Sequence, residues 1–197
     1  MRITIDKRIP LGAGLGGGSS DAATALLVLN ALWQCGLNLG ELAALGLRLG
    51  ADVPVFVHGR SALGSGVGEI LQPLELGERH YVLVFSDTRI STAEVFRDPQ
   101  LKRDSAPIAL ASALAGAGRN DCEAVVRKLH PDFAERFRTL EEFGTPRMTG
   151  TGSCIFLQMA NENAAADTAH ELKCRYNVRA VRGLDRSPLH EMLQSGM

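Results

Sequence analysis

The chain has 197 residues, of which 45% are hydrophobic and 22% are charged, as in an ordinary globular protein of one large or two small domains. A net charge of −1 and an aromatic content of 5% disfavour a nucleic-acid-binding surface. No stretch is long and apolar enough to cross a membrane, and the first residues lack the apolar core of a signal peptide. We therefore expect a cytoplasmic protein.

Cysteines and histidines are dispersed along the sequence. Cys35, Cys122, Cys154 and Cys174 form no CxxC pair, which indicates reduced thiols rather than a disulfide framework or a zinc site. The histidines are equally scattered. We expect no metal cluster built from side chains alone.

The first predicted elements are a strand over residues 3–9, a glycine-rich loop over residues 10–20, and a buried helix over residues 21–33 with Trp33 as a core anchor. A loop between a strand and a helix start directs backbone N–H groups and the positive end of the helix dipole toward an anion. Glycines let a phosphate approach closely, and residues 19–21 (Ser-Ser-Asp) are types that cap helices. This stretch therefore predicts a phosphate-binding loop.

Two familiar phosphate loops fit this stretch less well. The P-loop requires a Lys after its glycines, where this sequence has Ser-Ser-Asp. The dinucleotide fingerprint G-x-G-x-x-G is present as Gly12, Gly14 and Gly17, but it requires a second strand that ends in an acidic residue, and here a second helix is predicted instead. A flexible turn without a ligand is a further alternative, which the entropic cost of ordering so many glycines disfavours.

A second helix and a hairpin complete the first region. Asn38 and Glu41 have the spacing of a capping box at the start of a helix over residues 38–49. Asp52 then lies on a short turn before a proline. Two interpretations of Asp52 remain open, a capping or turn residue and a general base near the phosphate loop. Residues 61–74 alternate small and apolar types and predict a hairpin.

The second region begins with a strand over residues 80–85, and residues 91–94 carry a capping signature for a short helix. The pattern then predicts helices over residues 108–115, 120–130 and 132–143, a small-residue loop over 147–153, a strand over 154–159, a helix over 161–176 and a strand over 178–181. This order of elements predicts an α+β fold, and its last strand–helix–strand piece suggests a ferredoxin-like second layer.

The glycine-rich loop resembles the ATP loop of the GHMP kinases, a family that includes galactokinase and the homoserine and mevalonate kinases. The resemblance rests on Pro10-x-x-x-Gly14-Leu15-Gly16 followed by Gly-Gly-Ser-Ser-Asp-Ala-Ala. Further motifs occur in the family's order at residues 49–56, 66–69, 120–121 and 149–154. Together they narrow the resemblance to the branch that uses ATP to phosphorylate the 2-hydroxyl of a CDP-linked methylerythritol in non-mevalonate isoprenoid biosynthesis.

The resemblance implies a role for each motif. Asp52 falls on the catalytic aspartate, and Mg²⁺ would be bound together with ATP. Thr92 and Phe96 fall near positions that line the substrate site. The implied ATP-binding positions are Pro10, Leu11, Gly12, Ala13, Gly14, Leu15, Gly16, Gly17, Gly18, Ser19 and Ser20. The implied supporting loop, which packs beside them, comprises Thr149, Gly150, Thr151, Gly152 and Ser153.

The chain departs from the family in length. Family members are longer by roughly 90 N-terminal residues, in a segment whose Pro-Ala-Lys-Leu-Asn-like motif supplies a Lys beside the catalytic Asp. Lys7 is not that lysine. We therefore expect residues 1–75 to form an incomplete, ribosomal-protein-S5-like ATP-binding domain and residues 76–197 the C-terminal, ferredoxin-like domain of a GHMP kinase fold. Uncovered apolar surface on the helix over residues 21–33 and little or no kinase activity from the chain alone are also expected.

Three other functions remain open from the sequence. They are a non-catalytic nucleotide-binding fragment, a GHMP kinase of another small-molecule alcohol, and a dinucleotide-dependent oxidoreductase. ATP binding without turnover would favour the first, and binding of NADH would favour the last.

Overall fold

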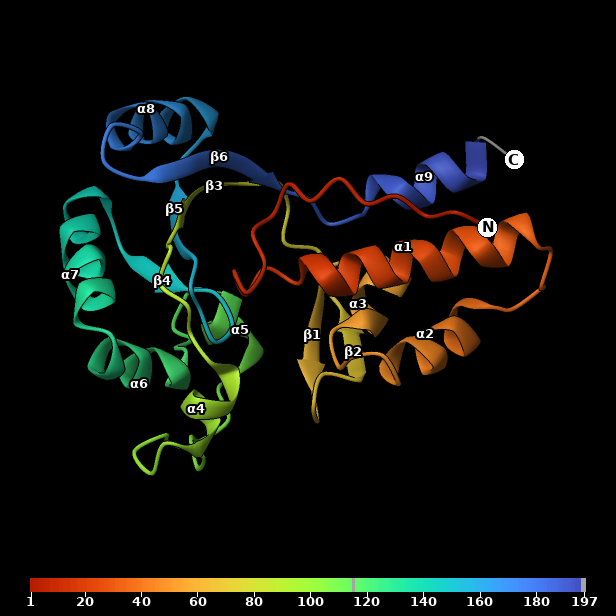
Figure 1. Ribbon diagram of the computed structural model, residues 1–197, viewed down its shortest axis with the longest axis horizontal. Coiled ribbons are helices and arrows are strands. Elements are labelled where there is room, and N and C mark those ends of the chain that lie inside the picture. Colours follow the sequence, from red (N-terminus) through yellow and green to blue (C-terminus); the bar gives the residue numbers. More distant parts are fainter. Residues whose placement is uncertain (115, 196–197) are drawn as a thin grey trace. The chain divides into compact units, whose positions relative to one another are not determined.

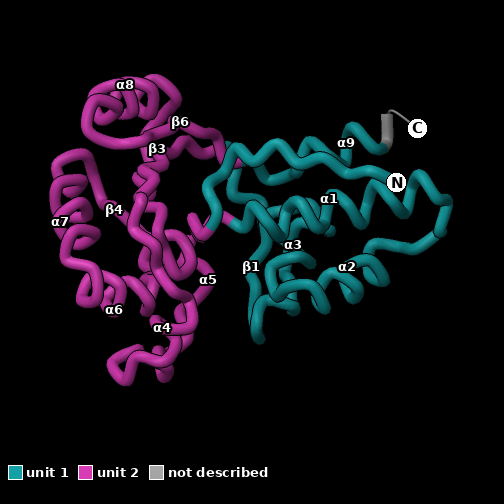
Figure 2. Tube along the Cα trace, in the orientation of Figure 1, with its two compact units in different colours: residues 1–11, 16–78, 184–197 teal, residues 12–15, 79–183 magenta. Residues whose placement is uncertain are grey.

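The computed structural model describes residues 1–114 and 116–195 (Figure 1). The chain forms two compact units (Figure 2). Unit 1 contains Met1–Leu11, Gly16–Glu78 and the stretch that begins at Leu184, and unit 2 contains Gly12–Leu15 and Arg79–Gly183. A functional domain boundary after residue 75 stays a prediction.

Unit 1 consists of helices and one hairpin. Its elements are α1 (Gly17–Leu32), α2 (Leu39–Leu47), α3 (Val53–His58), β1 (Ala62–Ser65), β2 (Ile70–Pro73) and α9 (Pro188–Ser195). The hairpin predicted over residues 61–74 is confirmed, because β1 and β2 pair antiparallel. Neither α3 nor α9 was expected from the sequence pattern.

The strand predicted over residues 3–9 is wrong. These residues lie in the described part of the chain and belong to neither of its sheets. A strand is stable only when its backbone N–H and C=O groups pair with a neighbouring strand. Without such a neighbour among the described residues, Ile3, Ile5 and Ile9 remain exposed.

Helix α1 begins at Gly17, earlier than the residue 21 predicted from the sequence. Its N-cap is Gly16, whose φ of 67° is a left-handed conformation that glycine adopts without steric cost. A Cβ at Gly16 would lie 2.7 Å from Cζ of Phe56, so the packing of α3 also requires glycine there. Residues 19–21, expected to cap the helix, lie inside it instead.

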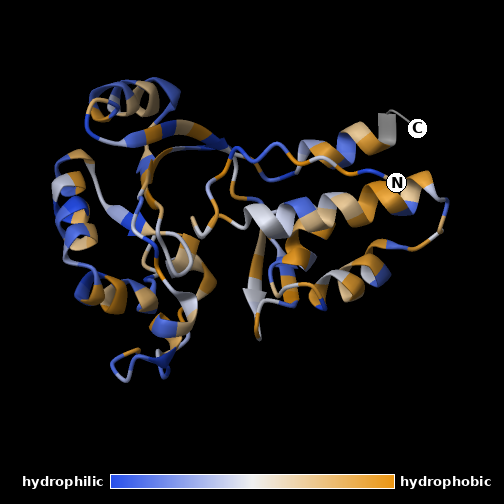
Figure 3. Ribbon diagram, in the orientation of Figure 1, coloured by the Kyte–Doolittle hydropathy of each residue, from blue (hydrophilic) through white to orange (hydrophobic). Residues whose placement is uncertain are grey.

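One face of α1 packs in the core of unit 1, and the C-terminal end of the helix is exposed. Ala23 and Leu27 are buried in a cluster with residues of α2 and α3, and Leu189 and Leu193 of α9 pack against that cluster. Trp33 is 62% exposed, so its prediction as a core anchor is wrong. Figure 3 shows α1 as hydrophobic over most of its length. Leu32, at the end of α1, is 55% exposed, whereas the other large apolar side chains of α1 are buried or half-buried, so the predicted uncovered apolar surface is present only at this end of the helix. Among the described helices, none combines the length and the apolar character needed to cross a bilayer.

Unit 2 is built on one antiparallel sheet. Its elements are β3 (Arg79–Phe85), α4 (Thr92–Arg97), α5 (Leu110–Leu114), α6 (Asp121–Leu129), α7 (Pro131–Leu140), a 3₁₀ turn (Glu141–Phe143), β4 (Pro146–Met148), β5 (Ile155–Met159), α8 (Glu162–Leu172) and β6 (Asn177–Gly183). The strand order β4–β5–β3–β6 is that of a ferredoxin-like fold, as predicted. Residues 146–148 form a strand where the sequence predicted a loop from residue 147, and residue 115 of the predicted helix over 108–115 lies outside the described residues.

Asparagine and serine caps determine where several helices begin. The Asn38 side chain accepts from Glu41 N and the Glu41 carboxylate accepts from Asn38 N, which confirms the capping box of α2. The side chains of Ser91, Asn120 and Asn161 each accept a hydrogen bond from a first-turn amide, in α4, α6 and α8 respectively. The sequence could predict where these helices begin, because a cap and the amide that it binds lie within three residues of each other.

The two faces of the unit 2 sheet have different partners. Val82, Val84, Ile155 and Leu157 lie on one face and are buried in the main core with α6, α7 and α8. Alternate residues of β3 point to the opposite face, where Leu83 and Phe85 join a second cluster with Ala13, Leu15 and Cys154. The glycine-rich segment Gly12–Leu15 therefore rests on the sheet of unit 2.

A carboxylate joins the two segments of unit 1 that flank Arg79–Gly183. Asp185 accepts hydrogen bonds from the amides of Leu76, at 2.8 Å, and Gly77, at 2.7 Å. In unit 2, Arg79 and Gly183 are paired in the register of β3 and β6. The start and the end of Arg79–Gly183 are thus held together twice, by the Asp185 carboxylate in unit 1 and by the pairing of β3 with β6 in unit 2.

The cysteines differ sharply in predicted reactivity. Cys35 and Cys174 are exposed, whereas burial raises the pKa of the Cys154 thiol to about 12. Because the thiolate is the nucleophile, iodoacetamide at pH 8 should alkylate Cys35 and Cys174 first and leave Cys154 unmodified. Mass spectrometry of tryptic peptides measures this order, and the same reaction in denaturant, where all four should react, is the control. Equal rates at Cys154 and Cys35 in the folded chain would contradict the burial.

Candidate functional site

Residues 12–15 are fixed to the loop at residues 149–153 by their backbone carbonyl groups. Thr149 Oγ1 donates to the carbonyl of Ala13 at 2.7 Å, and Ser153 N donates to the carbonyl of Gly12 at 3.1 Å. Ala13 itself is buried. All of these groups lie in unit 2. The loop at 149–153 therefore packs beside residues 12–15 and binds two of their carbonyl groups.

This arrangement determines where the amides of the segment point. In a planar trans peptide the C=O and the next N–H lie on opposite sides of the chain. With the carbonyls of Gly12 and Ala13 turned toward residues 149–153, the amides of Ala13 and Gly14 are directed to the opposite side. Among the described residues, neither amide donates to another group of the chain. They are free to bind an anion.

The close approach of the two segments requires glycine at position 14. Its φ is 66°, and a Cβ there would lie 2.5 Å from the carbonyl oxygen of Thr149. A Cβ on Gly150 would in turn lie 3.6 Å from Cα of Gly14, an ordinary van der Waals contact. The literal G-x-G-x-x-G pattern thus has a structural cause at Gly14 that has nothing to do with dinucleotide binding.

The start of α1 provides a second set of open donors, in unit 1. Gly17, Gly18 and Ser19 occupy the first turn, whose amides have no acceptor within the helix. The N-cap Gly16 offers no side chain, and the first turn has no acidic residue. Since the helix dipole adds positive potential here, the first turn of α1 is suited to a phosphate.

A groove of about 860 Å³ runs along α1 from its first turns. Its walls are the extended residues 1–7, Leu11 and one face of α1 from Gly18 to Leu29. Lys7 crosses the groove to pair with Asp21, with 2.6 Å between Nζ and Oδ2. The volume lies in the range of ordinary ligand pockets. An apolar wall beside open amides suits a ligand with a flat ring at one end and phosphates at the other.

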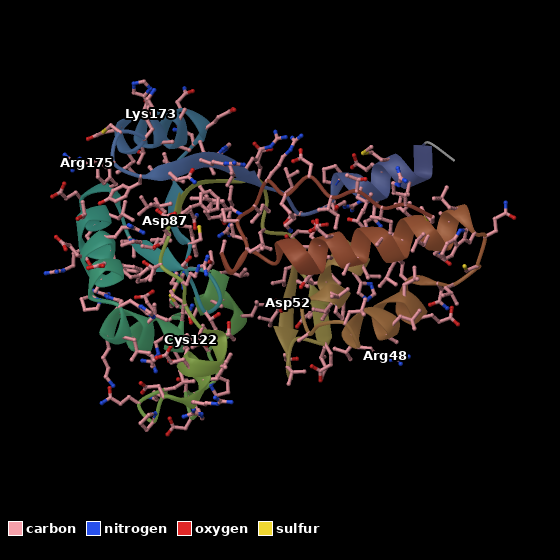
Figure 4. The ribbon with its side chains drawn as sticks, viewed as in Figure 1. Arg48, Asp52, Asp87, Cys122, Lys173 and Arg175 are labelled. Atoms are coloured by element: carbon pink, nitrogen blue, oxygen red, sulfur yellow. The ribbon has the colours of Figure 1, made fainter. Side chains whose placement is uncertain are left out.

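Asp52 occupies the N-cap position of α3 but does not cap it. Its side chain, labelled in Figure 4, is exposed and accepts no hydrogen bond from the helix. Within the described part of the chain it also forms no ion pair. Helix α3 packs against α1, with Phe56 on Gly16. Asp52 therefore lies in a turn, as one interpretation expected, but does not cap the helix, and its carboxylate is available to a ligand.

The loop at residues 149–153 is also bonded to α4, to the N-cap of α6 and to the residue after β3. Thr151 Oγ1 lies 2.9 Å from Thr92 Oγ1, and Ser153 Oγ donates to the carbonyl of Ser86 at 3.2 Å. The Asn120 amide donates to the carbonyls of Met148 and Gly150. Phe96, on the same short helix as Thr92, is 54% exposed. The structure thus brings Thr92 and the supporting loop together, which local sequence could not predict.

The start of α6 holds ionisable groups with shifted pKa values. A hydrogen bond from Ser105 and the charge of Arg119 lower the pKa of the Asp121 carboxyl. Burial raises the pKa of Cys122. Among the described residues, no three His, Cys, Asp or Glu side chains gather as a metal site would require.

Comparison with known proteins identifies the class. The family model of the GHMP kinases N terminal domain matches residues 1–60, and that of the GHMP kinases C terminal matches residues 100–178. A crystal structure of 4-(cytidine 5'-diphospho)-2C-methyl-D-erythritol kinase superimposes with a TM-score of 0.77 at 36% identity, over 90% of this chain and 68% of that one. The chain therefore belongs to the GHMP kinase family.

Curated relatives narrow the similarity to one kind of GHMP kinase. A 4-diphosphocytidyl-2-C-methyl-D-erythritol kinase of Halorhodospira halophila is 51% identical over 95% of the chain. The protein of the same name from Chromohalobacter salexigens is 48% identical over 97% of it. The chain spans 66% of the length of each of these relatives.

The glycines of the candidate site should differ in their tolerance of a side chain. Replacing Gly14 by Ala combines a left-handed φ with a clash on Thr149, so we expect a loss of about 3 kcal/mol in the free energy of unfolding. Gly12→Ala has the same φ problem but open space, and about 1–2 kcal/mol is expected. Gly18→Ala, inside α1, should be neutral or stabilising. Urea unfolding measures the series, and an equal effect at Gly12 and Gly14 would show that the contact with Thr149 is absent.

Proposed function

We propose that this protein is an ATP-dependent kinase that phosphorylates the 2-hydroxyl of 4-diphosphocytidyl-2-C-methyl-D-erythritol, a step of isoprenoid biosynthesis. The observation that carries the proposal is the 51% identity to the Halorhodospira halophila kinase over 95% of the chain. The geometry of the candidate site supports the same chemistry. The proposed setting is the cytoplasm, with ATP and a CDP-linked polyol as the small-molecule partners.

In this proposal Pro10–Ser20 bind the triphosphate of ATP. Phosphoryl transfer requires stabilisation of the charge that develops on the γ-phosphate, and fixed backbone amides provide it without reorganisation. The amides of Ala13 and Gly14 and those of the first turn of α1 are the donors. Mg²⁺ arrives bound to the phosphates, and the groove along α1 accepts the nucleoside part of the nucleotide.

Asp52 is the proposed general base. A carboxylate without a partner in the described chain can accept the proton of the attacking hydroxyl and fix its direction. Thr92 and Phe96 are proposed to line the acceptor site, where an exposed phenyl ring can stack on a base or a sugar face. Thr149–Ser153 hold the ATP segment in place.

The function is tested with the 197-residue chain and with a fusion that adds the N-terminal third of the Halorhodospira halophila relative before it. Equilibrium binding of ATP and phosphoryl transfer to the CDP-linked methylerythritol, homoserine and mevalonate are measured for both. Transfer to the first acceptor alone supports the proposal. Transfer only to another alcohol would identify a different GHMP kinase, and ATP binding without transfer in either protein would support a non-catalytic nucleotide-binding protein.

Asp52→Asn tests the role of the proposed base. In the fusion that adds the N-terminal third, we expect the turnover number to fall by about a hundredfold or more while the affinity for ATP stays the same, because the amide cannot accept the hydroxyl proton. Asp167→Asn, an exposed aspartate on α8, is the matched control and should keep full turnover. Steady-state kinetics and equilibrium binding separate the two effects. Near-normal turnover of the Asp52 variant would exclude it as the base.

A further inference from the structure

The contacts of Asn120 go beyond those of a helix cap. Its Oδ1 accepts from the amide of Cys122 at 3.0 Å, at the start of α6. Its Nδ2 donates to the carbonyl of Met148 at 3.1 Å and to that of Gly150 at 2.6 Å. These two carbonyls flank Thr149. We propose that Asn120 is a positioning residue for the ATP-binding segment and acts through the loop at residues 149–153; this inference rests on the proposed function.

Only an amide side chain can make this set of bonds. The oxygen meets an N–H group and the nitrogen meets two C=O groups, so each atom has the partner that its chemistry requires. Ser or Asp could cap α6 equally well but could not donate to both carbonyls from this position. The choice of Asn at this cap is therefore explained by the loop and not by the helix.

The effect of Asn120 can be followed through a series of hydrogen bonds to the segment that it positions. Holding the carbonyls of Met148 and Gly150 fixes the Met148–Thr149 and Gly150–Thr151 peptide planes, one just before Thr149 and one a residue after it. Thr149 Oγ1 then meets the carbonyl of Ala13, and Ser153 N meets that of Gly12. Those two carbonyls decide the direction of the amides of Ala13 and Gly14. Every group in this path lies in unit 2.

The residues before Asn120 and after it are themselves anchored. The Arg147 guanidinium donates to the carbonyl of Gly118, which ties this stretch to β4. Asp121 is bound by Ser105 and Arg119. Asn120 is therefore presented to the loop by a stretch of backbone that is held from both sides, as a positioning residue requires.

Asn120→Asp tests the inference, with Asn161→Asp as the matched control. Both variants keep an N-cap acceptor in front of a first turn that already holds an acidic residue. Only Asn120→Asp breaks two hydrogen bonds donated by the side-chain amide and places a negative charge against two carbonyl oxygens. We expect the Kd for ATP to rise about tenfold or more in Asn120→Asp, with KM for ATP rising and the turnover number of the active fusion changing little, and neither to change in Asn161→Asp.

Hydrogen exchange of the Ser153 amide gives a readout that needs no nucleotide. This amide is bonded to the Gly12 carbonyl, and its exchange should become about tenfold faster in Asn120→Asp while amides of the central strand β3 keep their protection. Unchanged Ser153 exchange and unchanged ATP affinity in a folded Asn120→Asp variant would overturn the proposal.

A second variant protects the test against misfolding. Thr149→Val removes the hydroxyl that donates to Ala13 and should reproduce the loss of ATP affinity, which Thr149→Ser should restore. Equal ATP affinity in Thr149→Val and the unmodified chain would overturn the path through the loop. Failure of the unmodified chain and of the fusion to bind ATP would overturn the proposed function instead, and the Ser153 exchange would still decide whether Asn120 positions residues 12–15.

Discussion

Two backbone carbonyl groups, those of Gly12 and Ala13, are bonded to residues 149–153, and the rest of the candidate site depends on this constraint. Because a peptide plane is rigid, fixing its oxygen also fixes the opposite N–H group. These bonds hold the glycine-rich segment in one backbone conformation, although glycines by themselves allow many. The side chain of Thr149 and the amide of Ser153 fix the backbone conformation of this segment, which its glycines leave free.

The elements that could be predicted are those whose causes are local. Capping of α2 by Asn38 and the β1–β2 hairpin depend on residues a few positions apart, and both are present. The strand expected at residues 3–9 depends on a neighbouring strand, and no described strand pairs with it. The prediction that Trp33 is a core anchor is wrong for a related reason. A helix that is apolar on most sides does not reveal which of its sides are covered by other elements. Helix α3 is too short for its periodicity to be recognised.

The candidate site divides in the same way. The glycines and Asp52 could be found because their residue types are unusual in their setting. The resemblance pointed to residues 149–153 as a supporting loop, but the bonds through which Thr149 and Asn120 act could not be predicted, because their partners lie far away in the sequence or are backbone carbonyls with no residue-specific signature. One weak signal existed: Asn, unlike Ser or Asp, brings a donor to a helix cap that needs only an acceptor.

The carboxylate of Asp185 has a consequence for how such chains can vary. It binds the backbone just before β3, and Arg79 pairs with Gly183 in the sheet. The residues between Arg79 and Gly183 therefore form a closed loop whose two ends meet. Lengthening a loop whose ends are already fixed costs little, since closure entropy grows only with the logarithm of its length. Insertions and deletions in the connections of unit 2 should thus leave the folding of unit 1 nearly untouched. In the order of the chain, Arg79–Gly183 is an insertion between two segments of unit 1, and its length can vary because both of its ends are anchored.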